Sequence, residues 1–271
     1  MVDLNGFDFT FSNKMLFPSF APDVEFKSKK KDIIGVIKIN KCLLLRYISD
    51  FDNPNYSSFW YIIKDKFIPI EDFSKNTRNQ VKKGLKNCEV KKVSLDFFRS
   101  NCYEIYSSSI LSYGQTPISK TEFKNASYNK EMRDFWIVFC RETNTPIAYS
   151  SNKITDNSVN YTYIKYNTDY QNLYPSYALH YEMDKYYLEE KKVKFVNVGA
   201  RSLLHETGIQ DFLINKFKYR KAFCKLNIVY SPLFGVVVNM MFPFRGLINK
   251  ISSQKLSSVK AVLKQHEISK N

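Results

Sequence analysis

The sequence predicts a mixed α/β fold, and three observations lead to this prediction. First, runs with partial alternation of apolar and polar residues occupy residues 135–142, 146–155 and 159–167, and turn-like clusters separate them. Second, residues 175–190 begin with a proline and carry an apolar stripe at helical spacing. Third, residues 194–202 return to a short, apolar, β-branched segment. An antiparallel meander, a crossover helix and a further strand predict a sheet with flanking helices.

The elements before this meander start with a small sheet. "DIIGVIKI" (residues 32–39), "CLLLRYI" (42–48) and "FWYIIK" (59–64) are short β-type runs, and prolines lie between and around them. We therefore expect residues 1–70 to form a β-rich N-terminal segment. Either this segment is a degenerate partner subdomain or it extends the one sheet.

A basic helix and two further helices come next. Ser74 or Asn76 can cap the helix, and residues 88–93, "CEVKKV", are then extended. Residues 95–112 and 119–127 have helical character.

The C-terminal part of the predicted core closes the sheet. Thr207 and Gln210 have the capping-box spacing at the start of a second helix. "AFCKLNIVYSP" (residues 222–232) then predicts the last strand. The predicted organisation is thus an N-terminal segment (1–70), an α/β core (71–232) and a basic amphipathic tail (233–271).

Composition and charge limit the classes of partner. The chain has 271 residues, 44% of them hydrophobic, and a net charge of +15, so we expect a globular protein with an anionic partner. From Phe212 onward there are eleven basic residues and one acid. The five cysteines are odd in number and form no CxxC pair, which favours reduced thiols and no metal site. No secretory signal or 18-residue apolar run is present, so the predicted location is the cytoplasm, with peripheral contact at the inner face of the membrane as an extension.

The order of elements and three segments resemble a known superfamily. The segments are "SKNTRNQVKKGLKNCEV", "YQNLYPSYALHYEMDKYY" and "VNVGARS" with the later "FLINKFKYRK". Over residues 70–230 the chain resembles the Gcn5-related N-acetyltransferase (GNAT) fold, and within it the Fem-type (FemAB-like) branch. The resemblance implies a mostly antiparallel mixed sheet whose fourth and fifth strands, around Tyr163 and Val196, splay apart. It also implies the transfer of an acyl or aminoacyl group to an amine.

The donor is left open by one departure from the wider superfamily. Ordinary acetyltransferases have a glycine-rich loop at the start of the crossover helix, where backbone N–H groups approach the pyrophosphate of coenzyme A. Residues 170–176, "YQNLYPS", contain no glycine. Fem-type enzymes also lack that loop, and their donor can be a charged transfer RNA, which a basic surface suits. Acyl-coenzyme A is itself anionic, so both donors fit the charge.

The predicted catalytic residues lie at the carboxyl ends of the two splayed strands. His205 or Glu206, directly after the fifth strand, is the predicted general base. The other reading is that both are cap-region residues that satisfy nearby backbone groups. Tyr163 is predicted to share one face of the fourth strand with Tyr161 and Lys165, and a phenol there can protonate a leaving thiolate. Packing of the sheet face is the other reading of these aromatic residues.

The predicted donor-binding residues flank the same place. Tyr174, Ser176 and Tyr177 begin the crossover helix and can donate to a phosphate, or they can serve as a plain helix start. Arg201 can grip a phosphate bidentately or form a structural ion pair, and Lys165 can meet an anionic donor.

These observations lead to one functional prediction and two alternatives. The prediction is an N-acyltransferase that uses acyl-coenzyme A and acts on an amine, such as a sugar in cell-surface polysaccharide biosynthesis. The first alternative is a Fem-like aminoacyl-tRNA-dependent transferase acting on a peptidoglycan-type precursor. The second is a non-catalytic nucleic-acid or membrane adaptor. Because the tail combines apolar clusters with lysines, it is also suited to an anionic membrane face and a lipid-linked acceptor.

Overall fold

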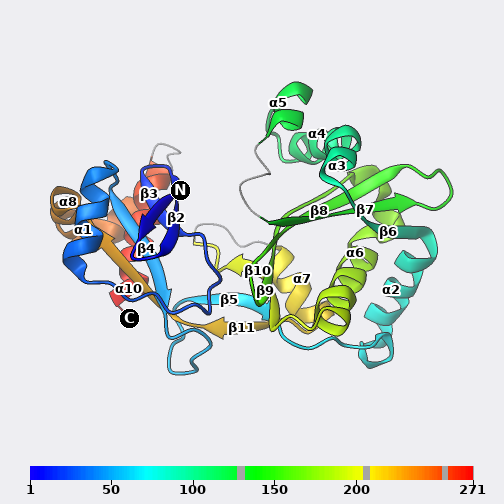
Figure 1. The fold of residues 1–271 in the computed structure, drawn as a ribbon, viewed down its shortest axis with the longest axis horizontal. Helices are drawn as coiled ribbons and strands as arrows, with labels where there is room; N and C mark the ends of the chain where they lie inside the picture. Colours follow the sequence, from blue (N-terminus) through cyan, green and yellow to red (C-terminus); the bar gives the residue numbers. More distant parts are fainter. Residues whose placement is uncertain (127–131, 204–207, 252–255, 271) are drawn as a thin grey trace. The chain divides into compact units, whose positions relative to one another are not determined.

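The computed structural model describes residues 1–126, 132–203, 208–251 and 256–270. The chain divides into two compact units (Figure 1). Unit 1 comprises Met1–Ile62, Ala200–Gly208 and Lys221–Asn271, and unit 2 comprises Ile63–Gly199 and Ile209–Arg220.

Unit 1 contains a five-stranded sheet in the order β1-β2-β3-β4-β12. Its strands are antiparallel except for the β3–β4 pair. The bounds are β1 (Val2–Leu4), β2 (Phe7–Ser12), β3 (Met15–Pro18), β4 (Leu44–Ser49) and β12 (Lys225–Tyr230). Helix α1 (Lys30–Ile39) buries Ile33 and Ile37 against this sheet. The C-terminal helical segment is α8 (Pro232–Met241), η4 (Phe242–Phe244), α9 (Arg245–Lys250) and α10 (Ser257–Lys270).

Two sequence predictions about these elements are wrong. Residues 32–39 form most of helix α1 instead of a strand, because Ile33 and Ile37 lie one helical turn apart and fill the same core. The predicted last strand is two strands: β11 (Arg220–Phe223) lies at the edge of the seven-stranded sheet, and β12 pairs with β4 in the five-stranded sheet. The buried Cys224 separates them.

The second sheet has seven strands in the order β11-β5-β10-β9-β8-β7-β6. The bounds of the other six strands are β5 (Trp60–Lys64), β6 (Cys88–Val93), β7 (Arg133–Cys140), β8 (Pro146–Ile154), β9 (Ser158–Tyr166) and β10 (Phe195–Ala200). Strands β6 to β9 are antiparallel neighbours, whereas β9 and β10 are parallel. The predicted meander and the mixed α/β fold class are therefore confirmed.

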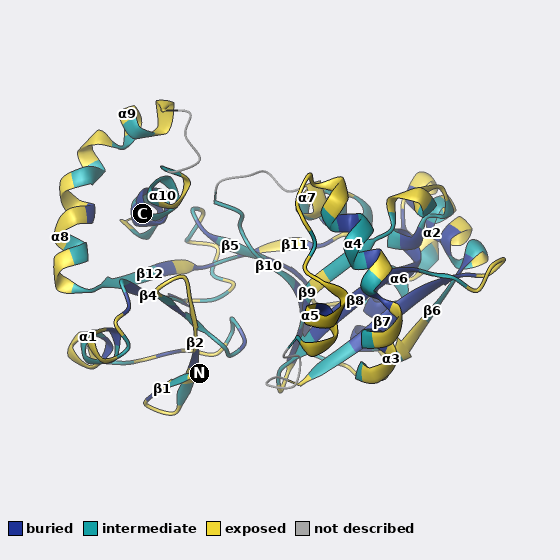
Figure 2. Cartoon of the chain, turned by 90° about the horizontal axis from the view of Figure 1, so that it is seen from above, coloured by how far each residue is buried: buried dark blue, intermediate teal, exposed yellow. Residues whose placement is uncertain are grey.

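Helices cover both faces of this sheet in unit 2 (Figures 1 and 2). On one face, α3 (Leu95–Asn101), α4 (Tyr103–Ser112) and α5 (Lys120–Asn125) bury aromatic side chains against Phe135 and Ile137 of β7. On the other face, Trp136 donates a hydrogen bond to the hydroxyl of Tyr187, which follows α6 (Pro175–Asp184). Neighbouring residues of β7 point to opposite faces, so the sheet is sandwiched between these two helix layers.

The remaining elements include helix α2 (Lys75–Asn87), which packs on the start of α6. Ser74 caps α2, as predicted, by accepting a hydrogen bond from the Thr77 N–H. Helix α2 packs closely on α6 at Gly84. The short helices η1 (Ile70–Asp72) and η2 (Thr168–Leu173) precede α2 and α6, a π-helical turn (Lys185–Glu190) follows α6, and α7 spans Gly208–Phe217.

Candidate functional site

Strands β9 and β10 are paired at one end and part at the other. Their parallel register runs from Phe195 opposite Ser158 to Asn197 opposite Asn160. The buried Asn197 amide then donates to the Val159 carbonyl (3.4 Å), and its oxygen accepts the Gly199 N–H (3.2 Å). Gly199 has a φ of +92°, which side-chain-bearing residues rarely adopt. The amide side chain replaces the strand ladder here, and the predicted splaying is confirmed.

A cavity of about 400 Å³ lies where the two strands part. Its walls include Tyr161, Thr162, Ile164 and Tyr166 of β9, Val198 of β10 and Ile209 of α7. The last turn of α4 and helix η2 complete the lining. We call this space the wedge cavity. Its walls combine apolar surface with hydroxyl groups, as is usual for small-molecule sites.

A β-bulge decides which side chains of β9 reach the wedge cavity. Ser151 of β8 pairs with Tyr163, but the next residue, Asn152, pairs with Tyr161, so Thr162 is the extra residue. Tyr163 therefore points away from the face that carries Tyr161. The prediction that these two tyrosines share one face is wrong for this reason. Tyr163 is 53% exposed, and the Arg133 guanidinium lies 5.6 Å from its ring centroid.

Behind the wedge cavity, the carboxylate of Asp184 gathers three buried groups. The Lys64 ammonium lies 2.8 Å from Asp184 Oδ2, and the hydroxyls of Tyr161 and Tyr219 donate to Oδ1 at 3.0 and 2.7 Å. Burial, reinforced by the negative Asp184, holds the pKa of both phenols well above the ordinary value. Tyr161 is thus a neutral wall of the cavity, held in place by the carboxylate.

Tyr166 and His180 connect the wedge cavity to α6. The Tyr166 hydroxyl lies 3.5 Å from Nε2 of the fully buried His180. Burial lowers the pKa of His180 to about 4, with Asp184 opposing this shift and Lys64 adding to it. Burial also raises the pKa of Tyr166. At neutral pH the pair is therefore a neutral imidazole and a neutral phenol, and the phenol can act as a proton donor.

Residues at the start of α6 have structural partners. Tyr174 is the N-cap residue and has a left-handed backbone (φ +60°). Its ring contacts the ring of Tyr177, and the Lys83 ammonium lies over it. Tyr177 is buried against the rings of Phe212 and Phe217, while Ser176 lies partly buried in the first turn. The donor-binding role predicted for Tyr174, Ser176 and Tyr177 stays a prediction.

The other predicted residues lie in several places. Lys165 sits over the ring of Tyr113 (5.2 Å), and burial lowers its pKa. Arg201, in unit 1, donates to the Ser58 carbonyl at 2.7 Å and stacks on Trp60. His205 and Glu206 lie outside the described residues, so their predicted role as the base stays a prediction.

Sequence reasoning did not select Tyr166, Asp184 or Lys64. The spacing of His180 and Asp184, one helical turn apart, signals that they can interact. No local pattern connects Lys64 to Asp184, which is 120 positions away.

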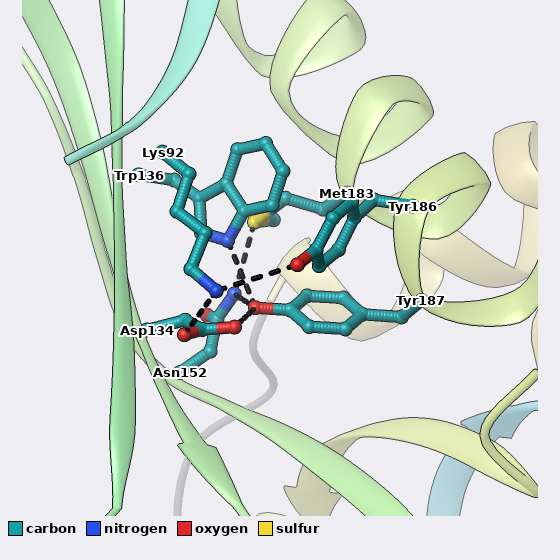
Figure 3. A network of polar contacts seen from close by, with 7 residues as sticks. All are labelled: Lys92, Asp134, Trp136, Asn152, Met183, Tyr186 and Tyr187. Atoms are coloured by element: carbon teal, nitrogen blue, oxygen red, sulfur yellow. Dashed lines mark hydrogen bonds and ion pairs between the residues drawn. The ribbon is translucent and has the colours of Figure 1, made fainter. Parts of the chain in front are cut away.

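A second polar network in unit 2 is structural. Tyr187 accepts hydrogen bonds from Trp136 and Asn152 and donates to Asp134, which also pairs with Lys92 at 2.6 Å (Figure 3). This network connects α6 and its π-helical extension to strands β6, β7 and β8. Within the described ranges, no group of three or more His, Cys, Asp or Glu side chains is placed to hold a metal ion.

Comparison with known proteins defines the fold. No protein-family model matches the sequence, and no curated protein matches it. Among solved structures, FemX is similar over 85% of this chain and 86% of its own, with a TM-score of 0.58 and 10% identity. The C-terminal DUF2156 domain of a putative lysylphosphatidylglycerol synthetase from Agrobacterium fabrum has a TM-score of 0.54 and 8% identity, covering 86% of this chain and 83% of that one. The structure of L-PGS from Bacillus licheniformis covers 98% of this chain and 86% of its own, with a TM-score of 0.52 and 10% identity. The chain therefore has a GNAT-like fold of the Fem type.

Proposed function

We propose that this protein transfers an acyl or aminoacyl group to an amine, with the reactive end of the donor in the wedge cavity. The observation that supports the proposal is the parting of β9 and β10 at Asn197, which leaves a cavity of about 400 Å³ with Tyr166 in its wall. The resemblance of the chain to acyl- and aminoacyltransferases of the same fold agrees with it. A donor arm held between two strands is oriented for attack, which lowers the entropic part of the barrier.

The bond changes assign a role to Tyr166. The amine nitrogen attacks the carbonyl carbon of the donor ester or thioester, a C–N bond forms, and the C–O or C–S bond breaks. The leaving oxygen or sulfur needs a proton, and the attacking amine must lose one. We assign the first proton to the Tyr166 phenol, which lines the wedge cavity and is protonated at neutral pH. The proton that the base takes from the amine then returns through water to the Tyr166 oxygen. His205 or Glu206 remains the proposed base.

The donor can be a charged transfer RNA or acyl-coenzyme A. The start of α6 supports the first, because the tight turn is formed by Tyr174 with Pro175 and not by a glycine-rich phosphate loop. The net charge of +15 favours either anionic donor. For the acceptor we propose an amine on a lipid, a peptidoglycan precursor or a surface sugar.

A transfer assay tests this function. Charged transfer RNAs and acyl-coenzyme A thioesters are offered with an amine-bearing, water-soluble acceptor, and labelled product is counted. Tyr166→Phe should lower kcat by about 10²- to 10⁴-fold. Tyr103→Phe is the matched control, because its hydroxyl donates to the Ile118 carbonyl and does not line the wedge cavity. His205→Ala and Glu206→Ala test the base in the same assay. Equal turnover of the Tyr166→Phe variant and the parent would refute the role of Tyr166, and no turnover with either donor class would refute the function.

A further inference from the structure

The C-terminal helical segment of unit 1 exposes a continuous apolar stripe. Its members lie one, three or four positions apart along α8, η4 and α9, and the last member, Ile251, directly follows α9. Within each helix this spacing places them on one side. The stripe consists of Leu233, Val236, Val237, Met240, Phe244, Leu247 and Ile251. Figure 2 shows α8 and α9 largely exposed.

The exposure is large for such side chains. Leu233 is 84% exposed, Met240 68% and Leu247 65%. The opposite side of the same helix is used for packing: Val238 is 3% exposed, and the Phe242 ring contacts His266 of α10 at 4.8 Å. Helix α8 is therefore apolar on its inner and outer sides. The sequence from Pro232 to Phe244, which comprises α8 and η4, has no charged residue. An outward stripe of this size on a folded protein marks an interaction surface.

Cationic groups lie at the α9 end of the stripe, where Lys250 is exposed and the Lys260 ammonium donates to the Ile251 carbonyl (2.8 Å). From Pro232 to Asn271 the sequence has six lysines and arginines and one acid, Glu267. Glu267 is already paired with Arg245 (3.2 Å) and Lys264 (2.8 Å). Lys250 is exposed at the end of α9, next to Ile251 of the stripe. An apolar strip with cationic groups at one end matches a bilayer that has acyl chains below anionic headgroups.

We infer that the stripe docks unit 1 on an anionic membrane surface. Helices α8 and α9 lie in the plane of the interface, the stripe enters the acyl boundary, and Lys250 meets the headgroups. Across the described part of the chain, none of the helices combines the length and the apolar composition that crossing a bilayer needs. A second copy of the chain is a poorer partner, because two chains that each carry a net charge of +15 repel one another.

The inference rests on the proposed function for its acceptor and deepens it, since it assigns the acceptor amine to a lipid of the surface on which the chain is held. It can fail independently of that function, because binding to vesicles requires neither donor nor acceptor. Conversely, the transfer assay with a water-soluble acceptor does not depend on the membrane.

Vesicle sedimentation of the full chain tests the inference. The protein is mixed with phosphatidylcholine vesicles that contain about one-third phosphatidylglycerol, and with vesicles of phosphatidylcholine alone, at about 0.1 M salt. We expect binding to the anionic vesicles and weaker binding to the neutral ones. The double variant Leu233→Gln/Met240→Gln should bind at least about tenfold more weakly. Lys250→Gln should weaken binding to anionic vesicles about fivefold.

The matched control is Ile39→Gln, which replaces an apolar residue that is 81% exposed on α1, outside the stripe. It should bind as the parent does, and all variants should melt at the parent temperature because the replaced side chains are exposed. Two results overturn the inference: no binding of the parent chain to anionic vesicles, or equal binding by the double variant. A parent chain that dimerises in solution, with a monomeric double variant, also overturns it, because the stripe is then a contact between copies.

Discussion

His180 is a fully buried imidazole whose nearest described partner is the Tyr166 hydroxyl, and its neighbours determine how it titrates. Its Nδ1 has no hydrogen-bond partner among the described residues. Burial disfavours the protonated form, so the pKa falls from 6.5 to about 4. The folded state therefore keeps His180 neutral at pH values where the unfolded chain takes up a proton.

This difference predicts a pH dependence of stability. The folded pKa lies below the unfolded one, so the contribution of His180 is fully present above pH 6.5 and is lost as the pH falls towards 4. Between pH 6.5 and 5, the free energy of unfolding should decrease by about 1 kcal/mol per pH unit because of this group. Urea titrations of the parent chain and of His180→Gln measure it.

In His180→Gln the free energy of unfolding should change less steeply with pH than in the parent, whatever the absolute stability of the variant. The comparison variant is His266→Gln, which removes the other described histidine with a lowered pKa. Identical slopes for the parent and His180→Gln would show that the pKa of His180 is the same in the folded and unfolded states, which would contradict the prediction.

Asp184 is the residue whose loss should affect unit 2 most. Lys64 and Asp184 are 3% and 0% exposed, so the Asp184→Asn substitution leaves a buried ammonium without its counter-charge. Breaking a buried pair in this way costs about 3–5 kcal/mol of unfolding free energy. Asp65→Asn, in the half-exposed pair with Arg220, should cost less than about 1 kcal/mol. A chemical denaturation series in which both variants lose the same small amount would contradict the structural role of Asp184.

At the scale of residues, the sequence indicated the correct strand, β9, but Tyr163 instead of Tyr166. A bulge of one residue at Thr162 exchanges the faces of β9, so Tyr166 reaches the wedge cavity and Tyr163 does not. Alternation alone gives no signal for such a bulge. Likewise, the contact of Lys64 with Asp184 depends on tertiary packing, which a local pattern cannot reveal.

At the scale of elements, the contact between α2 and α6 depends on one glycine. A Cβ on Gly84 would lie 2.7 Å from the Tyr174 carbonyl oxygen and 3.1 Å from the Ala178 nitrogen. Both are backbone atoms, and Tyr174 holds the strained turn that begins α6. Helix α2 therefore cannot accept a side chain there without moving away from α6.

Gly84→Ala should consequently destabilise the protein by about 1–3 kcal/mol, despite the better helix propensity of alanine. Gly35→Ala, in α1, is the matched control because no atom lies within 4 Å of its added Cβ. This control should be neutral or more stable by up to about 1 kcal/mol. Thermal unfolding of Gly84→Ala and Gly35→Ala, measured side by side with the parent, gives the two stability changes. Equal changes would contradict the close approach of α2 and α6.

The order of the elements from α2 to β10 was largely predictable, because many of these elements have a local signal. Ser74 caps α2, Pro175 begins α6, and turn-like clusters separate the strands of the meander. Residues 32–39 were misassigned because isoleucine and valine favour strands, while the spacing of Ile33 and Ile37 fits a helix. The five-stranded sheet pairs β12 with β4, nearly 180 positions apart in the chain, and no local signal encodes that pairing.

At the scale of the whole molecule, charge and fold favour the same class of function. The net charge of +15 suits an anionic donor, and the GNAT-like fold of the Fem type has its parted strands at β9 and β10. The resemblance indicated this parting from the sequence. The Asn197 side chain and Gly199, which produce it here, became apparent only in the structure.

The most direct test of the central claim is to fill the wedge cavity and measure transfer. Ile164→Trp places a larger side chain in the cavity wall, and Leu111→Trp places the same side chain at a position on α4 that is 60% exposed. With labelled donor and a water-soluble amine, we predict that Ile164→Trp loses at least about 99% of turnover while staying folded, a change of some 3 kcal/mol in the barrier. Leu111→Trp should keep the parent rate. Full turnover by a folded Ile164→Trp variant would contradict the claim that the donor reacts between β9 and β10.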